Sequence, residues 1–187
     1  MAVGDRDRWN DKWAEAGRGT SHGSSLADLV SPWLPGSGAL LDVAGGGSQD
    51  SLHFARLGLD VTVADVSDVG LIQARQRALA EDLTITTVEV DLEEQSLPPG
   101  PFRVITVANY LQRDLFPSMI ERLDEGGILA VVIATESNLE RNENPRREFL
   151  LASDEITSLV GGLEIVHHSE EWRDNGRHEA HLVARFG

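Results

Sequence analysis

The sequence predicts an α/β fold of the Rossmann-like, doubly wound type, with a seven-stranded sheet that is mostly parallel and ends in an antiparallel hairpin. Three observations support this prediction. Residues 39–65 read as strand, glycine-rich bend, helix and strand, which is one right-handed βαβ unit. Residues 102–108 are almost all apolar, as in a parallel strand buried on both faces. Residues 163–186 contain two strand patterns around a turn at 174–176.

The first βαβ unit defines the expected ligand site. We expect a strand over Ala39–Val43, a bend at Gly45–Gly47, a helix over about Gln49–Leu57 and a strand over Val61–Ala64 that ends at Asp65. Parallel strands of this kind end at one edge of the sheet, where such folds bind nucleotides.

The remaining elements follow from turn and capping signals. Apolar residues at helical spacing predict a short helix over 25–34, stopped by Pro32 and Pro35. Ser67 is expected to cap a helix that runs to about Ala80, and Ser153 a helix that ends at Gly161–Gly162. The third and fifth strands are expected at 84–90 and 128–134, the latter after a turn at 125–127.

Length and composition limit the function classes. The 187 residues form one domain's length, so we expect a single domain over 1–187. With no cysteine, no long apolar run and no leader pattern, a cytoplasmic protein is expected. Net charge is -15, from 31 acids against 16 bases, which repels phosphate backbones and anionic lipids. We therefore expect a small-molecule substrate, no nucleic-acid or membrane partner, and a monomer or homodimer.

The glycine-rich bend and its acids predict the cofactor. Gly45, Gly46 and Gly47 let the backbone approach a ligand closely, and Asp65 can accept hydrogen bonds from both hydroxyls of a ribose. Asp50 stands where a dinucleotide fingerprint has its third glycine, and an acid there competes with a pyrophosphate for the helix N-terminus. Asp42 adds a second negative charge. The pocket thus suits an adenosine compound with a positive centre and no phosphate, namely S-adenosyl-L-methionine (SAM), with S-adenosyl-L-homocysteine as product.

The bend also resembles the first motif of the class I SAM-dependent methyltransferases, especially the small TehB-like tellurite/selenite group. That motif runs D-x-G-x-G-x-G, and Asp42, Ala44, Gly46 and Ser48 stand at its four fixed positions. Only the middle glycine is kept. We expect Gly45 and Gly47 to compensate by moving the flexible points of the backbone by one residue.

The resemblance extends to the later strand ends. It gives Asp91 a hydrogen bond to the adenine amine, although an acid that merely opens a surface loop fits the sequence equally well. Residues 109–113 resemble the fourth motif, which lies beside the sulfonium. The cofactor-binding residues implied are Trp9, Trp13, Asp42, Ala44, Gly45, Gly46, Gly47, Asp65, Val66, Ser67, Asp91, Leu92, Asn109, Tyr110 and Leu111.

The N-terminal residues 1–23 contain two tryptophans at helical spacing. Trp9 and Trp13 stand four residues apart, so both lie on one face of a short helix. The segment is expected either to serve as a lid over the cofactor, as in the resembled group, or to be a scaffold helix packed on the core.

The expected catalytic residues are few, because SAM carries its own leaving group and the protein mainly aligns the reactants and excludes water. An anionic acceptor needs cationic positioning, for which Arg113, Arg177 and His178 are candidates beside Tyr110. TehB-like proteins carry an Arg/His cluster near the C-terminus, at the place of the last two. The polar loop 136–147 follows a strand end and is expected either to fold over the site or to be a plain surface loop.

Other chemistries find little support in the sequence. No metal site is expected, because His167 and His168, like His178 and His181, point to opposite faces of a strand and need ligands from elsewhere. A serine hydrolase elbow is incomplete, since Asp50 stands at its second glycine. Two alternatives to a methyltransferase stay open, a non-catalytic SAM or nucleotide sensor and, disfavoured by Asp50, an NAD-linked oxidoreductase.

Overall fold

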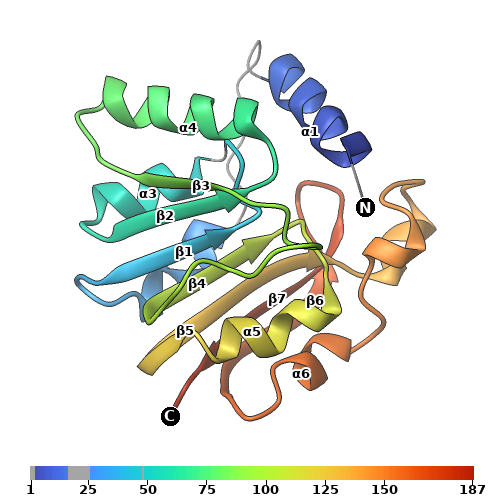
Figure 1. Ribbon diagram of the computed structural model, residues 1–187. Coiled ribbons are helices and arrows are strands. Elements are labelled where there is room, and N and C mark those ends of the chain that lie inside the picture. Colours follow the sequence, from blue (N-terminus) through green and yellow to red (C-terminus); the bar gives the residue numbers. More distant parts are fainter. Residues whose placement is uncertain (1–2, 17–25, 48) are drawn as a thin grey trace.

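The computed structural model describes residues 3–16, 26–47 and 49–187 and shows one seven-stranded sheet with the strand order β3-β2-β1-β4-β5-β7-β6 (Figure 1). The first five strands are parallel, and β7 is antiparallel to both β5 and β6. This topology confirms the predicted fold class. The strands are β1 Ala39–Val43, β2 Asp60–Asp65, β3 Thr86–Glu89, β4 Phe102–Ala108, β5 Leu123–Ala134, β6 Glu164–Trp172 and β7 His178–Arg185.

Six α-helices and four short 3-10 helices connect these strands in the described residues. The α-helices are α1 Val3–Ala16, α2 Leu26–Val30, α3 Asp50–Arg56, α4 Asp68–Ala80, α5 Phe116–Ile120 and α6 Glu155–Leu159. The 3-10 helices are η1 Ser31–Trp33, η2 Arg113–Leu115, η3 Glu136–Glu140 and η4 Arg147–Phe149. None of the helices in the described ranges is long and apolar enough to cross a membrane.

Three local expectations are wrong. Ser153 does not cap α6: the N-cap is Asp154, with φ 57° and no side-chain cap bond, while the backbone N–H of Ala152 donates to Glu155 at 2.9 Å. β5 starts at Leu123 rather than after the glycine pair, because a register shift against β4 absorbs the irregular backbone. Pro32 does not stop the first short helix, since the chain continues there as η1, where a proline is tolerated in the first turn.

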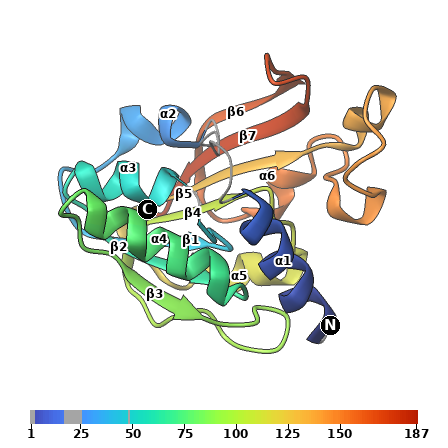
Figure 2. The same cartoon turned by 90° about the horizontal axis from the view of Figure 1, so that it is seen from above.

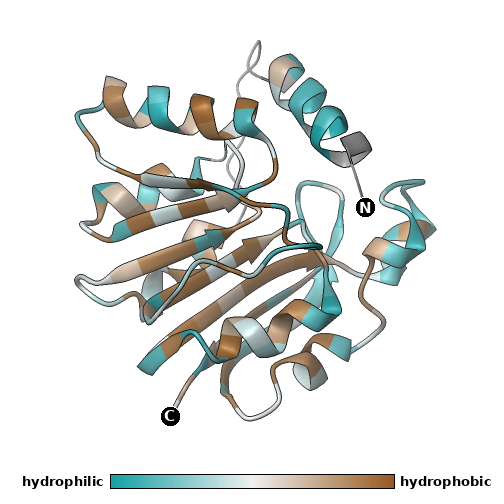
Figure 3. Ribbon diagram, in the orientation of Figure 1, coloured by the Kyte–Doolittle hydropathy of each residue, from teal (hydrophilic) through white to brown (hydrophobic). Residues whose placement is uncertain are grey.

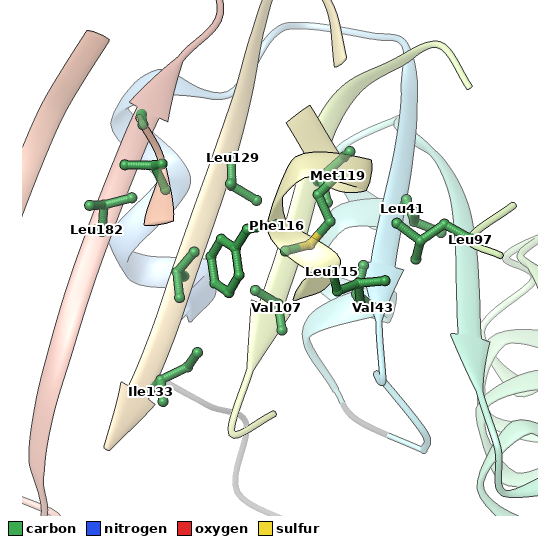
Figure 4. Close-up of a cluster of buried hydrophobic side chains, with 14 of the residues drawn as sticks. Leu41, Val43, Leu97, Val107, Leu115, Phe116, Met119, Leu129, Ile133 and Leu182 are labelled. Atoms are coloured by element: carbon green, nitrogen blue, oxygen red, sulfur yellow. The ribbon is translucent and has the colours of Figure 1, made fainter. Parts of the chain in front are cut away.

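The core consists of two apolar layers, one on each face of the sheet. One layer packs under α5 and α6 and includes Leu41, Ile105, Phe116 and Leu182 (Figure 4). The other lies under α2, α3 and α4 and includes Val104. Val104 and Ile105 are both fully buried although they face opposite layers, which confirms that β4 is the central strand. Figure 3 shows the corresponding apolar colour along the inner strands, a mainly hydrophilic α1 and an α4 of mixed colour.

The carboxyl ends of the parallel strands meet at the edge of the sheet that α1 overlies (Figures 1 and 2). α1 is attached to α4 and to the end of β3. The Asn10 side chain donates to Asp68 at 2.7 Å, and Gln73 donates to the backbone oxygen of Trp13 at 2.8 Å. Arg6 forms an ion pair with Glu89 at 2.7 Å. The N-terminal helix thereby forms a wall above the strand ends.

Candidate active site

A cavity of about 840 Å³ opens at this edge. Its walls include α1, the ends of β1, β2 and β4, the segment after β3, and the two C-terminal segments around residues 144–149 and 175–179. The predicted site residues that line it are Trp9, Trp13, Asp42, Ala44, Gly45, Asp65, Val66, Asp91, Leu92, Asn109, Tyr110, Leu111 and Arg177. The strand ends expected from the sequence therefore do converge on one cavity.

The glycine bend keeps the register of the resembled motif. Ala44 and Gly46 have φ angles of 54° and 52°, so the left-handed positions stay at the first two glycine positions of the motif instead of moving by one residue. The expected shift to Gly45 and Gly47 is thus wrong, and Ala44 adopts a backbone conformation that costs a residue with a Cβ about 1 kcal/mol. Gly45 is required for another reason: a Cβ there would lie 2.4 Å from Oδ2 of Asp42. Ser48 lies outside the described residues.

Trp13 covers the outer side of this bend. A Cβ built on Gly46 would lie 2.4 Å from the Trp13 indole, and one on Gly47 would lie 3.2 Å from it. A Cβ built on Gly70 of α4 would lie 2.9 Å from the same indole. Gly46 and Gly47 therefore lie against the indole and are not among the residues that line the cavity, and their expected contact with the cofactor stays a prediction. They act by letting Trp13 lie flat against the backbone.

Asp65 lies at the end of β2 and faces the cavity. Its carboxylate accepts the backbone N–H of Ser67 at 2.7 Å and further backbone bonds from Gly46 and Val66. Burial nevertheless raises the pKa of Asp65 to about 6. Ser67 itself does not line the cavity: its hydroxyl caps α4 by accepting from Gly70 N–H at 3.0 Å. Its role is thus to start the helix and orient Asp65.

Asp42 lies at the floor of the cavity and is 2% exposed. The hydroxyl of Ser51 donates to one carboxylate oxygen and that of Thr106 to the other, the latter at 3.1 Å. Burial first, and then the negative charge of nearby Asp50, raise the pKa of Asp42 to about 7. The charge of this carboxyl therefore depends on pH near neutrality.

The loop after β4 lies at the centre of the cavity, as its position in the sheet predicts. Asn109 has φ 58°, a left-handed conformation that Asn tolerates better than most residues and that occurs often at functional sites. The Tyr110 hydroxyl donates to Gln112 at 2.5 Å, and Gln112 in turn donates to the backbone oxygen of Leu92. Burial and the neighbouring acids, Glu93 first, raise the pKa of Tyr110 further above its ordinary value, so its phenol stays protonated.

Of the three expected cations, only Arg177 lines the cavity. Arg113 donates to Glu155 at 2.5 Å and to the backbone oxygen of Leu150 at 3.0 Å, which fixes it between η2 and α6. The Nδ1 atom of His178 lies 2.6 Å from the Thr135 hydroxyl, and its ring lies edge-on to Trp172. Arg113 and His178 therefore hold loops together and are not among the residues that line the cavity, and their expected catalytic roles stay predictions.

The other lining residues were not proposed from the sequence as cofactor-binding or catalytic residues, although Asp50 was used there to predict the ligand. They are Arg8, Lys12, Asp50, Val90, Glu93, Ala108, Val132, Asn144, Pro145, Arg146, Phe149, Asn175 and Glu179. Two signals could have found some of them. Arg8 and Lys12 neighbour the tryptophans of α1, and the loop expected to fold over the site does contribute its last residues. Glu179 was hidden inside an apolar strand pattern, where nothing marks its side chain as facing a cavity.

Comparisons with known proteins agree with this geometry. Residues 40–127 match the family model described as a methyltransferase domain. TehB from Haemophilus influenzae aligns with a TM-score of 0.74 at 21% identity, over 95% of this chain and 67% of that one. A TehB-like SAM-dependent methyltransferase from Corynebacterium glutamicum aligns over 100% of both chains, with a TM-score of 0.71 at 14% identity. No curated protein matches the sequence.

A third solved structure has a bound product of methyl transfer. The magnesium protoporphyrin IX methyltransferase from Synechocystis, solved with S-adenosylhomocysteine, aligns with a TM-score of 0.75 at 17% identity over 97% of both chains. At these identities the structural likeness establishes the fold, while the family match covers β1 to the middle of β5, where the glycine bend, Asp65 and Asn109 lie. The family match over residues 40–127 and the fold of the whole chain support a class I SAM-dependent methyltransferase.

Proposed function

We propose that the protein transfers the methyl group of SAM to a small molecule with an anionic or soft nucleophilic group, such as a chalcogen oxyanion or a thiol. The observation that carries this proposal is the position of Arg177 on the cavity wall next to Asn109, the residue after the central strand. An arginine at that point can bind the negative charge of an acceptor next to the reacting centre. An oxyanion or a thiolate is already deprotonated and needs no general base.

The charged residues that line the cavity support the proposal that it has a cofactor half and an acceptor half. Asp50 and Asp65 lie with Asp42 around the first two strand ends, where we propose that the cofactor binds. Arg177 and Arg146 come from the two C-terminal loops and lie on the acceptor side. When bound, SAM supplies a methyl group on a cationic sulfonium; Asp65 holds the ribose, and Trp13 with the glycine bend excludes water on that side.

We also propose that α1 acts as a lid, because it contributes Trp9 and Trp13 to the cavity and lies above the strand ends, where polar contacts attach it to α4 and β3. The net charge of -15 supports a small-molecule acceptor over nucleic acid and a cytoplasmic protein over one bound to anionic membranes. We propose that the protein is a monomer or a homodimer.

Transfer of a labelled methyl group tests the proposal. Protein is incubated with SAM labelled in its methyl group and with separate acceptors: selenite, tellurite, a small thiol, a neutral alcohol and an amine. Label should move to the anionic or thiol acceptors and not to the alcohol or amine. Binding of SAM without transfer to any acceptor would favour a sensor, and binding of NAD would favour an oxidoreductase. Transfer to the neutral acceptors alone would contradict the anionic-acceptor proposal.

A further inference from the structure

Three side chains that commonly bind metals come together outside the cavity: Asp154, His168 and Glu170. His168 and Glu170 stand two apart on β6 and therefore share one face of the sheet. Asp154 precedes α6, which covers that face: Ile156 of α6 lies in the same apolar cluster as Leu182, the β7 partner of His168. One nitrogen or oxygen atom from each of the three side chains lies within 4.8 Å of the other two.

The spacing of the two β6 side chains suits a shared cation. Nε2 of His168 lies 3.6 Å from Oε1 of Glu170, which is too long for a good hydrogen bond. Two ligands of a tetrahedral zinc ion, each bound at about 2.0–2.1 Å, are about 3.4 Å apart. Oε1 of Glu170 also accepts the backbone N–H of Asp154 at 3.0 Å, which already links the two elements. Carboxylates that bind metals are commonly oriented by such a second hydrogen bond.

The histidine supplies an independent observation. Nε2 of His168 is fully buried and has no hydrogen-bond partner among the described residues, whereas buried polar atoms almost always have one. Its side chain is 20% exposed and that of Glu170 is 13% exposed, so the pair is partly withdrawn from solvent. A metal ion between the three groups would occupy this lone pair. Asp154 is exposed and makes no side-chain bond to cap α6, so its carboxylate can turn toward the pair.

We propose that Asp154, His168 and Glu170 form a binding site for a divalent transition-metal ion of the zinc type, with solvent water as the fourth ligand. An imidazole nitrogen with two carboxylates favours zinc and its neighbours over magnesium and calcium, which prefer oxygen ligands alone. Bound metal joins the start of α6 to β6, the outermost strand of the sheet. The site is separate from the methyl-transfer cavity, so it is a second, structural function of the fold.

Calorimetric titration with zinc chloride tests the site on the full chain, after removal of any affinity tag and treatment with a chelator. We expect one zinc ion per chain and a higher melting temperature with zinc, and no binding of magnesium or calcium at the same concentrations. His168→Ala should weaken zinc binding by about 10-fold to 100-fold or more. His167→Ala is the matched control: its ring packs on Trp33, 5.7 Å away between centroids, on the other side of β6, and zinc binding should be unchanged.

Asp154→Asn tests whether weaker zinc binding comes from the lost ligand and not from misfolding of the variant. Asn tolerates the left-handed backbone at this position, so the variant should keep the melting temperature of the metal-free protein and still bind zinc at least about 10-fold more weakly. Absence of zinc binding in the unaltered protein, or unchanged binding in both Asp154→Asn and His168→Ala, would overturn the proposal. Neither result affects the methyl-transfer proposal, because none of the three residues lines the cavity.

Discussion

The guanidinium of Arg177 donates a hydrogen bond to the side-chain oxygen of Asn109 and so connects the hairpin between β6 and β7 to the loop after the central strand. Glu179, which is 2% exposed, holds the same guanidinium through an ion pair of 3.4 Å. Asn175 in turn donates to Glu179 at 3.3 Å. The arginine is thereby oriented on two sides before any acceptor binds, and such preorganisation lowers the entropy cost of binding.

Replacing Arg177 should affect the acceptor and not the cofactor. In Arg177→Ala we expect the Michaelis constant for an anionic acceptor to rise about 10-fold to 100-fold, since a charge-assisted bond is lost, with little change in S-adenosylhomocysteine affinity. Arg113→Ala is the control, because that arginine pairs with Glu155 away from the cavity: it should lower the melting temperature by a few degrees at an unchanged Michaelis constant. Equal kinetic losses in both variants would refute the separate roles.

The change in melting temperature on ligand binding tests the cofactor assignment. S-adenosylhomocysteine at about a hundred times its dissociation constant should add about 2.7 kcal/mol to the free energy of unfolding. For a chain of this length that raises the melting temperature by about 5 to 10 °C. NAD and ATP at the same concentration should leave it unchanged. A shift with NAD and none with S-adenosylhomocysteine would contradict the cofactor assignment.

Asp65 should determine cofactor affinity. Asp65→Ala removes the proposed ribose contacts and should cost about 2 to 4 kcal/mol, or about 30-fold to 1000-fold in affinity, by calorimetry. Asp60→Ala provides a control at the exposed start of the same strand and should bind normally. Affinity of Asp65→Ala within about threefold of the unaltered protein would show that the ribose is held elsewhere.

The raised pKa of Asp65 also predicts how binding varies with pH. Its pKa of about 6 means that the carboxyl is protonated below that pH, and a protonated carboxyl cannot accept both ribose hydroxyls. Affinity for S-adenosylhomocysteine should therefore be constant above about pH 7 and fall about tenfold per pH unit well below pH 6. Isothermal titrations between pH 5 and 8 measure this, and a flat profile would contradict the assignment of Asp65.

Asp42 predicts a pH effect on stability. Its pKa rises from 3.8 to about 7 on folding, so the folded state binds the proton more tightly. The stability gained from this tighter proton binding is fully present below about pH 4. It decreases as the pH rises from there through about 7, where the folded protein also loses the proton. Asp42→Asn does not titrate, so its stability should fall less between pH 5 and 8, by a difference on the order of 1 to 4 kcal/mol in denaturant unfolding. Parallel pH curves for the two proteins would exclude a titration of Asp42 in this range.

The sequence predicts the fold well because its signals are local. The apolar run of β4, the glycine bend after β1 and the Ser67 cap of α4 each lie within a few residues, and all three occur in the structure, although the bend has its left-handed residues at Ala44 and Gly46. Asp65 was found in the same way, since a βαβ unit determines where its second strand ends. Boundaries that depend on distant contacts were missed, such as the start of β5, which pairs irregularly with β4.

Side-chain partners explain the errors at the site. Arg113 and Arg177 are both cations near the expected cavity, and only the fold shows that Glu155 and two backbone oxygens engage the former. The sequence also does not reveal that burial neutralises part of the charge of Asp42, because the pKa depends on the strands that surround it. Pairing between distant segments is the information that local patterns lack.

The placement of the four tryptophans gives the protein an optical signal for ligand binding. Trp9 and Trp13 line the cavity, while Trp33 packs on His167 and Trp172 lies under the guanidinium of Arg141. Two of the four indoles therefore lie at the wall of the site, where an entering adenosine changes the local polarity and can stack on the rings. Emission from the indoles should respond to S-adenosylhomocysteine without any added dye, and Trp13→Phe should remove much of that response. The same two residues would then report the motion of α1 in real time.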